Sequence, residues 1–329
     1  MRRHLGIWRA IVALISAALI TSVHANSLVN FATVPNTDYA MFGFGGMRGI
    51  GTGTVTVAGI SGTVTRAVLI WQGPTNSASA SANAAVTFNG TPIVGTNIGL
   101  SSDNCWSFTN SQAYQADVTP LVSGNGSYTL ANFFKPGGID INGVSLLVFY
   151  NDGNNANNRD IVVFLGNDSN QANTFDPAGW NAVLNGINYS SGTATLRVIV
   201  ADGQSFPDNG LKINTTVVVP PGSNWDGNTL PNGASAATTN GGLWDHSAYN
   251  ITALLTPGNN NLTLTDTGSS SDCLSLISTI FDLPVGAAPP PAGPVGPLNV
   301  PTLSEWVIVA LAMLIGAFGL LQTRRRRRI

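Results

Sequence analysis

The residues that enzymes most often use for catalysis are scarce in this sequence. Beyond residue 25 the chain has one histidine, His246, and no glutamate before Glu305. His246 follows Asp245 and could form part of a Ser–His–Asp arrangement, but no G-x-S-x-G or H-E-x-x-H motif supplies a nucleophile or a metal site. We therefore interpret His246 as a solvated turn residue before a strand with no nucleophile beside it, and we expect no catalytic residues. A hydrolase is a third hypothesis. It would be supported by a hydrolytic activity that is lost when aspartates are changed to asparagine.

Loops rich in Asp and Asn are better candidates, for metal binding. They lie at residues 151–160, 167–176 and 201–210 and carry the oxygen ligands that Ca²⁺ prefers. The resulting hypothesis is a weak calcium site at Asp152, Asp160 and Asp168. None of the loops has the D-x-[DN]-x-[DN]-G-x₅-E spacing, and solvated loops of an acidic protein explain them equally well. No other cofactor is expected.

Two further features suggest ligand sites but have simpler structural interpretations. The glycine run at residues 43–53 lacks the G-K-[ST] ending of a phosphate loop and precedes a strand, so close backbone packing or an irregular edge strand is favoured. Tryptophans could stack on sugars, but tryptophans in the core of a β-sandwich are the favoured interpretation. The candidates are Trp71, Trp106, Trp225 and Trp244.

The chain has two cysteines, Cys105 and Cys273. An even number of cysteines in an exported protein favours a disulfide, which would close a loop of 168 residues (273 minus 105) and join the two halves of the chain. Two separately buried thiols remain the alternative.

The candidate residues above lie within or between short segments with the composition of β-strands. Runs rich in Val, Ile, Thr and Leu recur between Gly, Asn, Pro and Asp clusters, and several alternate apolar with polar residues, as in GTVTVAGI and NLTLTD. No long segment of the body has a 3.6-residue apolar period. This pattern predicts an all-β fold with little helix.

The predicted strands also repeat in the same order at an offset near 130 residues. The matched pairs are 61–71 with 191–200, 85–93 with 210–218, 113–130 with 248–264, and 144–152 with 274–282. We infer a tandem duplication that gives two related β-sandwich domains, residues 26–170 and 171–284.

Two resemblances refine the fold. The turn Asp117-Val118-Thr119, the hairpin Gly124-Asn125-Gly126 and the dipeptide Asn89-Gly90 resemble the corresponding stretch of galactose-binding-like jelly-roll domains. Residues 43–73, the ADVTPLV segment and residues 143–168 are similar to a β-rich domain common in large secreted bacterial surface proteins. The first implies a jelly-roll fold, and the second implies an extracellular module that is not an enzyme.

Charge is distributed unevenly along the chain. Residues 26–299 hold six basic residues against 15 aspartates, a net charge of −9. Binding to nucleic acid depends on clustered Lys and Arg, so a nucleic acid partner is excluded. Charged residues make up only 9% of the chain, which suits an exported all-β protein.

The N-terminus has the pattern of a secretory signal peptide. Arg2, Arg3 and Arg9 precede an apolar run from Ala10 to Ile20, and the small-residue pattern predicts cleavage after Ala25. The residues after the Arg2-Arg3 pair fit a twin-arginine signal poorly, so ordinary export is favoured. Residues 1–25 are therefore assigned to a signal peptide.

The C-terminus has three successive parts after a Pro/Gly-rich linker at residues 285–299. Sixteen apolar residues from Trp306 to Leu321 rise about 24 Å, slightly less than a hydrocarbon core of about 30 Å, and predict a short transmembrane helix. The preceding heptad is Val300, Pro301, Thr302, Leu303, Ser304, Glu305 and Trp306. The final basic run, which predicts a cytoplasmic stop, is Arg324, Arg325, Arg326, Arg327 and Arg328.

These three parts together resemble the IPTL-type relative of the PEP-CTERM sorting signals. Val300 stands where that family usually has Ile, and Val307 where Gly is common. The resemblance implies an exosortase-type processing enzyme as a partner of the tail at residues 300–329. A permanent anchor would need only the apolar run and the arginines, so the heptad favours a signal that is cleaved.

The expected function is that of an exported, non-enzymatic surface or extracellular-matrix protein of a Gram-negative bacterium, with a structural or adhesive role. Its precursor would be tethered to the inner membrane by the tail. The alternative is a carbohydrate-binding module that acts on extracellular polysaccharide, suggested by the jelly-roll resemblance and the tryptophans.

Overall fold

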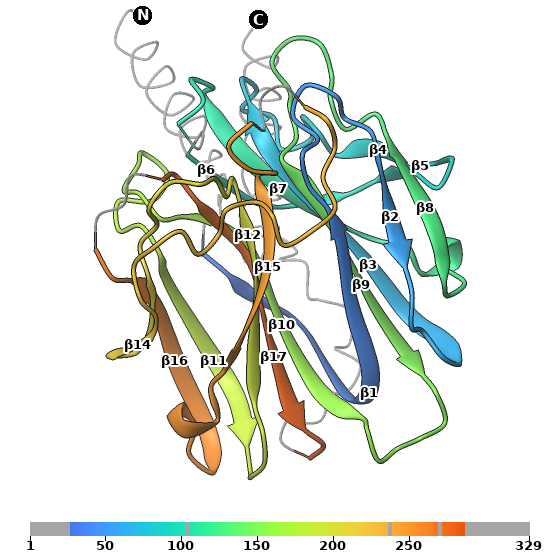
Figure 1. Cartoon of the computed structure of the whole chain (residues 1–329), viewed down its shortest axis with the longest axis vertical. Helices are drawn as coiled ribbons and strands as arrows, with labels where there is room; N and C mark the ends of the chain where they lie inside the picture. Colours follow the sequence, from blue (N-terminus) through green and yellow to red (C-terminus); the bar gives the residue numbers. More distant parts are fainter. Residues whose placement is uncertain (1–26, 103–104, 236–238, 269–271, 287–329) are drawn as a thin grey trace, which may run out of the picture. The chain divides into compact units, whose positions relative to one another are not determined.

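The computed structural model describes residues 27–102, 105–235, 239–268 and 272–286, and these residues form β-strands and two short 3₁₀ turns with no α-helix (Figure 1). The predicted all-β class is confirmed for this part of the chain. No helix in it has the length and apolar character needed to cross a membrane. The predicted signal peptide, the tail, and the linker beyond Gly286 lie outside the described residues.

The elements, in chain order, are β1 (Val29–Phe44), β2 (Gly53–Val57), β3 (Thr63–Thr75), β4 (Ala85–Phe88), β5 (Thr91–Val94), β6 (Thr96–Ser101), β7 (Asn110–Asp117), η1 (Thr119–Leu121), β8 (Gly126–Ala131), β9 (Gly143–Asn151), β10 (Arg159–Ser169), β11 (Asn181–Tyr189), β12 (Thr195–Ala201), β13 (Leu211–Ile213), β14 (Thr216–Val219), β15 (Trp244–Asn250), η3 (Thr252–Leu254), β16 (Gly258–Asp266) and β17 (Ser275–Pro284). We refer to β1 to β9 as the first half and to β10 to β17 as the second half.

The strands form one nine-stranded sheet and two four-stranded sheets. The nine-stranded sheet has the order β15-β12-β17-β10-β1-β9-β3-β7-β6. The first half adds the small sheet β2-β8-β4-β5, and the second half adds β11-β16-β13-β14. Every strand pair is antiparallel.

Alternation of side chains along the strands explains how three cores form. In β10, Val162 and Phe164 point into the core shared with the small sheet of the second half, whereas Ile161, Val163 and Leu165 point into a core between the halves. A strand covered on both faces needs apolar residues at every position, which is why β10 reads as the continuous run IVVFL. Strand β2 is covered on one face and alternates, with only Val55 and Val57 buried.

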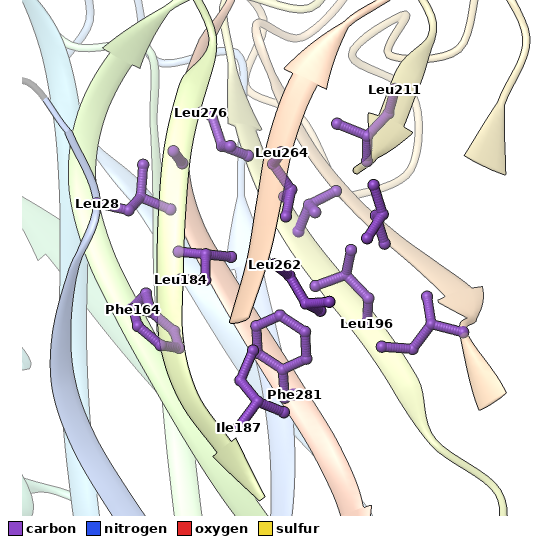
Figure 2. Packing of buried hydrophobic residues seen from close by; sticks show 14 of the residues in the cluster. Leu28, Phe164, Leu184, Ile187, Leu196, Leu211, Leu262, Leu264, Leu276 and Phe281 are labelled. Carbon is purple, nitrogen blue, oxygen red and sulfur yellow. The ribbon is translucent and has the colours of Figure 1, made fainter. Parts of the chain in front are cut away.

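The core of the second half is filled by leucine and aromatic side chains. Figure 2 shows Leu184, Leu262 and Leu264, from β11 and β16, lying against Leu196 and Phe281, from β12 and β17. The first half has a matching core between β2-β8-β4-β5 and its part of the large sheet. Each half is therefore a sandwich of two sheets.

A third core, the central core, joins the two halves. It contains 13 buried residues from both halves, among them Ile70, Phe149, Leu165 and Ile199. Exposing 13 such side chains at about 1.5 kcal/mol each would cost on the order of 20 kcal/mol, more than the total stability of an ordinary domain. The described part of the chain therefore behaves as one structural unit.

Strand β1 belongs to both halves. Its first part, Val29 to Thr37, pairs with β10, and its second part, from Asp38 onward, pairs with β9. The register shifts between Val34 and Thr37, where Asn36 adopts a positive φ of 51° that Asn tolerates better than most residues. This irregularity lets one strand change partners.

The same strand order occurs in both halves. The order β1-β9-β3-β7 of the first half corresponds to β10-β17-β12-β15 of the second, and β2-β8-β4-β5 corresponds to β11-β16-β13-β14. The repeated order begins at Arg159, in β10, whereas the predicted domain boundary at residue 170 follows that strand. Gene duplication and the division into two domains stay predictions.

Candidate functional site

The glycine run of residues 43–53 packs against a loop of the second half. Gly45 N–H donates to Pro231 O at 2.9 Å, and Gly233 N–H donates to Gly45 O at 3.0 Å. A Cβ at Gly45 would lie 2.5 Å from Asn232 Oδ1, so no larger residue fits without a shift of the loop. The run serves backbone packing, as its lack of a G-K-[ST] ending predicted.

Arg48, in the middle of this run, is the centre of a buried polar cluster between the halves. The junction cluster consists of Arg48, Trp106, Asp140, Asn142 and Asp202. Arg48 Nη2 lies 3.2 Å from Asp202 Oδ1, Arg48 Nε lies 4.0 Å from Asp140 Oδ2, and Arg48 also donates to Asn142 Oδ1. Burial lowers the pKa of Arg48, while the carboxylates of Asp202 and Asp140 oppose that shift.

Trp106 links the junction cluster to the cysteines. Its Nε1–H donates to both carboxylate oxygens of Asp202 at 2.7 and 2.9 Å, and the Arg48 guanidinium lies 4.2 Å from the centre of its ring. The neighbouring Cys105 forms a disulfide with Cys273, with a Cα–Cα distance of 6.0 Å. The disulfide thus joins the first half to the segment that leads into β17.

The other tryptophans of the sequence analysis do not form sugar-stacking platforms. Trp71, Trp225 and Trp244 are fully buried. Trp71 Nε1–H donates to Asn83 O at 2.9 Å, and Trp244 Nε1–H donates to Ser145 Oγ at 2.9 Å. They are core residues, as the sequence favoured, and Trp106 is the partly exposed exception.

A pocket of about 430 Å³ lies where β1 of the first half meets β12 and β15 of the second. The lining residues are Tyr39, Ala40, Met41, Arg197, Thr229, Leu230 and His246. Its volume is in the range of small-molecule sites, and its polar groups come from both halves. We call it the interhalf pocket and treat it as a candidate site.

His246 does not match the expectation of a solvated turn residue with no nucleophile beside it. It lies in β15, and its Nε2 is 2.7 Å from Ser145 Oγ of β9. The expectation failed because Ser145 is 101 residues away in sequence, where no local motif can indicate the contact. The pair nevertheless lacks the features of a catalytic pair, since Ser145 is fully buried and already accepts a hydrogen bond from Trp244.

The electrostatic surroundings of His246 keep it neutral. Burial, followed by the positive charge of Arg197, lowers its pKa to about 3. A histidine with so low a pKa is a weak general base at neutral pH. The neutral ring shares one hydrogen bond with Ser145 Oγ through Nε2.

The three aspartates predicted for calcium are not brought together. Asp160 and Asp168 lie near opposite ends of β10, about 26 Å apart at about 3.3 Å per residue. Asp160 accepts N–H groups from Asn36 and Gly286, both at 2.7 Å, whereas Asp152 accepts from Asn154 N–H at 2.7 Å within its own loop. Among the described residues no cluster of three His, Cys, Asp or Glu side chains could hold a metal ion.

Burial raises the pKa of several aspartates, Asp168 among them. Burial raises the pKa of Asp168 to about 9, with Asp176 adding to the shift, and raises that of Asp208 to about 7. Burial also raises the pKa of Asp245 and of Asp272, each to about 6. A raised folded-state pKa stabilises the fold at low pH, and this contribution is lost as the pH rises through the folded-state value.

The free energy of unfolding is therefore expected to fall between about pH 4, the ordinary aspartate pKa, and about pH 9. Asp168→Asn should raise it by on the order of 2 kcal/mol at about pH 8 and change it less at about pH 5, because the amide needs no proton on folding, whereas the cost of protonating the Asp168 carboxylate on folding grows as the pH rises. Urea unfolding at both pH values measures this. Asp152→Asn, in an exposed loop, is the control, and equal pH dependence of Asp168→Asn and the unaltered protein would contradict the assignment.

The comparisons with known proteins identify the tail. Residues 300–328 match the IPTL-CTERM motif, so the chain carries the C-terminal sorting signal of exported, surface-directed proteins. No curated protein matches the chain.

Solved structures similar to the chain include PNGase F, a glycosylasparaginase from Flavobacterium meningosepticum. It is 13% identical, with 80% of this chain and 98% of that chain covered and a TM-score of 0.24. A peptide-N(4)-(N-acetyl-beta-D-glucosaminyl) asparagine amidase is 14% identical, with 80% and 99% covered and a TM-score of 0.23. Scores this low carry no argument about fold or function.

Proposed function

We propose that this chain is a non-enzymatic protein of the bacterial cell surface or extracellular matrix, delivered there by its C-terminal signal, and that its paired sandwiches have a structural or adhesive role. The observation that carries the proposal is the sorting motif at residues 300–328. An exosortase-type enzyme would recognise the heptad and cleave the tail. Before cleavage the apolar run would hold the precursor in the inner membrane, with the arginines in the cytoplasm.

The structure of the body suits this role. The disulfide between Cys105 and Cys273 fits an oxidising compartment outside the cytoplasm. The central core and the junction cluster hold the two sandwiches together, which suits a protein that bears mechanical load. The buried Ser145 and the low pKa of His246 support a non-enzymatic role.

The second candidate function is binding to extracellular polysaccharide. The interhalf pocket favours it, because it is large enough for a sugar ring and has polar groups from both halves. It is compatible with surface delivery, since an adhesive protein needs a ligand.

Changing the heptad tests the proposal. Pro301→Ala combined with Thr302→Ala should leave the uncleaved precursor in the inner-membrane fraction, because the processing enzyme no longer recognises the tail. Immunoblots of membrane, surface and medium fractions measure this. Val300→Ile, which restores the usual residue of the family, is the control and should be sorted as the unaltered protein is. Surface delivery of the double variant at the normal level would contradict the proposal.

A further inference from the structure

The loop between β10 and β11 contains the one Asp–Pro peptide bond of the chain, Asp176–Pro177. Such a bond is chemically weaker than other peptide bonds, because the aspartate side chain can attack its own main-chain carbonyl and the proline nitrogen is a more basic leaving group. Whether the bond breaks depends on how the fold holds the carboxylate, the carbonyl and a proton donor.

The loop fixes both reacting groups of Asp176. Its carboxylate Oδ1 accepts the N–H of Ala178 at 3.0 Å, which folds the side chain back alongside the bond to Pro177. Its main-chain carbonyl oxygen accepts the N–H of Asn173 at 2.6 Å, which polarises the carbonyl carbon toward attack. Asp176 is buried and Pro177 is exposed, so the nucleophile is held in place while water can reach the bond.

Asp168, near the end of β10, provides a proton donor next to Asp176. The two side chains form a hydrogen bond, and two carboxyl groups can do so only if one of them keeps a proton. Burial, the hydrogen bond to Asp176 and the charges of Asp176 and Asp266 raise the pKa of Asp168 to about 9, so Asp168 is the protonated partner at neutral pH. Neighbouring carboxyl groups in different protonation states provide an acid and a nucleophile.

We infer that the Asp176–Pro177 bond is a self-cleavage site, with Asp176 as the nucleophile and Asp168 as the proton donor. The Asp176 carboxylate attacks the carbonyl carbon of its own residue and forms a cyclic anhydride. The carbon–nitrogen bond breaks, and the nitrogen of Pro177 takes the proton that Asp168 gives up.

Water completes the reaction. It opens the anhydride to the two carboxyl groups of a new C-terminal Asp176, and of the two protons released one returns to Asp168 and the other goes to the amine of Pro177. The net change is the addition of one water molecule to the chain. Each chain reacts once, so the inference does not require that the protein turn over a substrate.

The two fragments would stay together after cleavage. Cys105 lies before the bond and Cys273 after it, so the disulfide links the fragments. The central core also contains residues from both fragments, among them Leu165 and Ile199. Because the reaction needs the folded loop, a newly folded chain is intact and the cleaved form accumulates with time.

Incubation of the purified protein at neutral pH with protease inhibitors tests this inference. Electrophoresis with a reductant should show two fragments that replace the intact chain over time, whereas without a reductant a single species should remain. Mass spectrometry should find a C-terminus at Asp176 and an N-terminus at Pro177. The rate should not depend on protein concentration, because the reaction occurs within one chain.

Substitutions separate the two roles. Asp176→Ala removes the nucleophile and should abolish cleavage. Asp168→Asn should slow cleavage at least about 100-fold, because it removes the general acid, and this variant is expected to be more stable than the unaltered protein, so unfolding does not explain the loss. Asp152→Asn, in another loop, is the control and should cleave at the normal rate. In the unaltered protein the rate should fall as the pH rises through about 9, where Asp168 loses its proton.

Three results would overturn the inference. A chain that stays intact would show that the loop does not activate the bond, and normal cleavage of Asp168→Asn would show that Asp168 is not the proton donor. Fragments with other termini, or a rate that rises with protein concentration, would show cleavage by a separate protease. These results concern the body alone, so they are distinguishable from a failure of the sorting signal.

Discussion

Replacing both cysteines with serine is expected to lower the free energy of unfolding by about 4–5 kcal/mol, a large part of the stability of an ordinary domain. The disulfide closes a loop of 168 residues, and cross-linking so long a loop removes much of the conformational freedom of the unfolded chain. Denaturant unfolding of Cys105→Ser/Cys273→Ser and of the unaltered protein measures the difference.

Reduction provides the control for this prediction. A thiol reductant should bring the stability of the unaltered protein down to that of the double variant and leave the variant unchanged. The central core is intact in the variant, so it should still unfold in a single transition. A loss below about 1 kcal/mol would contradict the prediction, because the disulfide would then add little to the other contacts between the halves.

Arg48→Met is expected to lower the free energy of unfolding by about 3–5 kcal/mol, because it leaves a buried charge at Asp202 without its cation. Methionine keeps much of the side-chain volume, so the effect reports the charge and the hydrogen bonds to Asn142. Arg66→Met is the matched control and should have a small effect, since Arg66 is partly exposed and makes no ion pair among the described residues.

A double-mutant cycle distinguishes loss of the ion pair from general disruption of the junction. Asp202→Asn added to Arg48→Met should recover part of the lost stability, because it removes the unpaired carboxylate and keeps an acceptor for Trp106 Nε1–H. If the two changes are simply additive, Arg48 and Asp202 are not coupled, and the junction cluster does not stabilise the fold through this ion pair.

The strands of this fold could be predicted because their patterns are local. Alternation in β2 and β16 and the apolar runs of β10 and β17 follow from which faces are covered. The repeated order of segments also anticipated that the two halves share one strand order. The disulfide could also be predicted, because an even number of cysteines in an exported protein favours a disulfide whatever the fold.

The contacts of the candidate site could not be predicted in the same way. Arg48 and Asp202 are 154 residues apart, and Ser145 and His246 are 101 residues apart, so each pair depends on how the two sandwiches pack. The interhalf pocket is lined by Tyr39 of β1, close to where β1 changes partners near Asn36, and by residues of the second half, so it too depends on long-range pairing. A positive φ at one Asn leaves too weak a signal in the sequence to predict that change.

The body and the tail support the function in different ways. The tail indicates where the protein is delivered, since the motif at residues 300–328 is a sorting signal of exported proteins. The body is a disulfide-linked pair of sandwiches with a pocket between them. Our proposal joins the two in a surface protein with a structural or adhesive role.

The function proposed for this protein depends on a tail that is a sorting signal and is removed during maturation. Mass spectrometry of the mature protein from its native host tests this most directly, because intact mass and C-terminal peptides give both ends of the chain. We expect a C-terminus near residues 300–306, with the apolar run and the five arginines absent. A mature protein that still ends at Ile329 would contradict the proposed role of the tail.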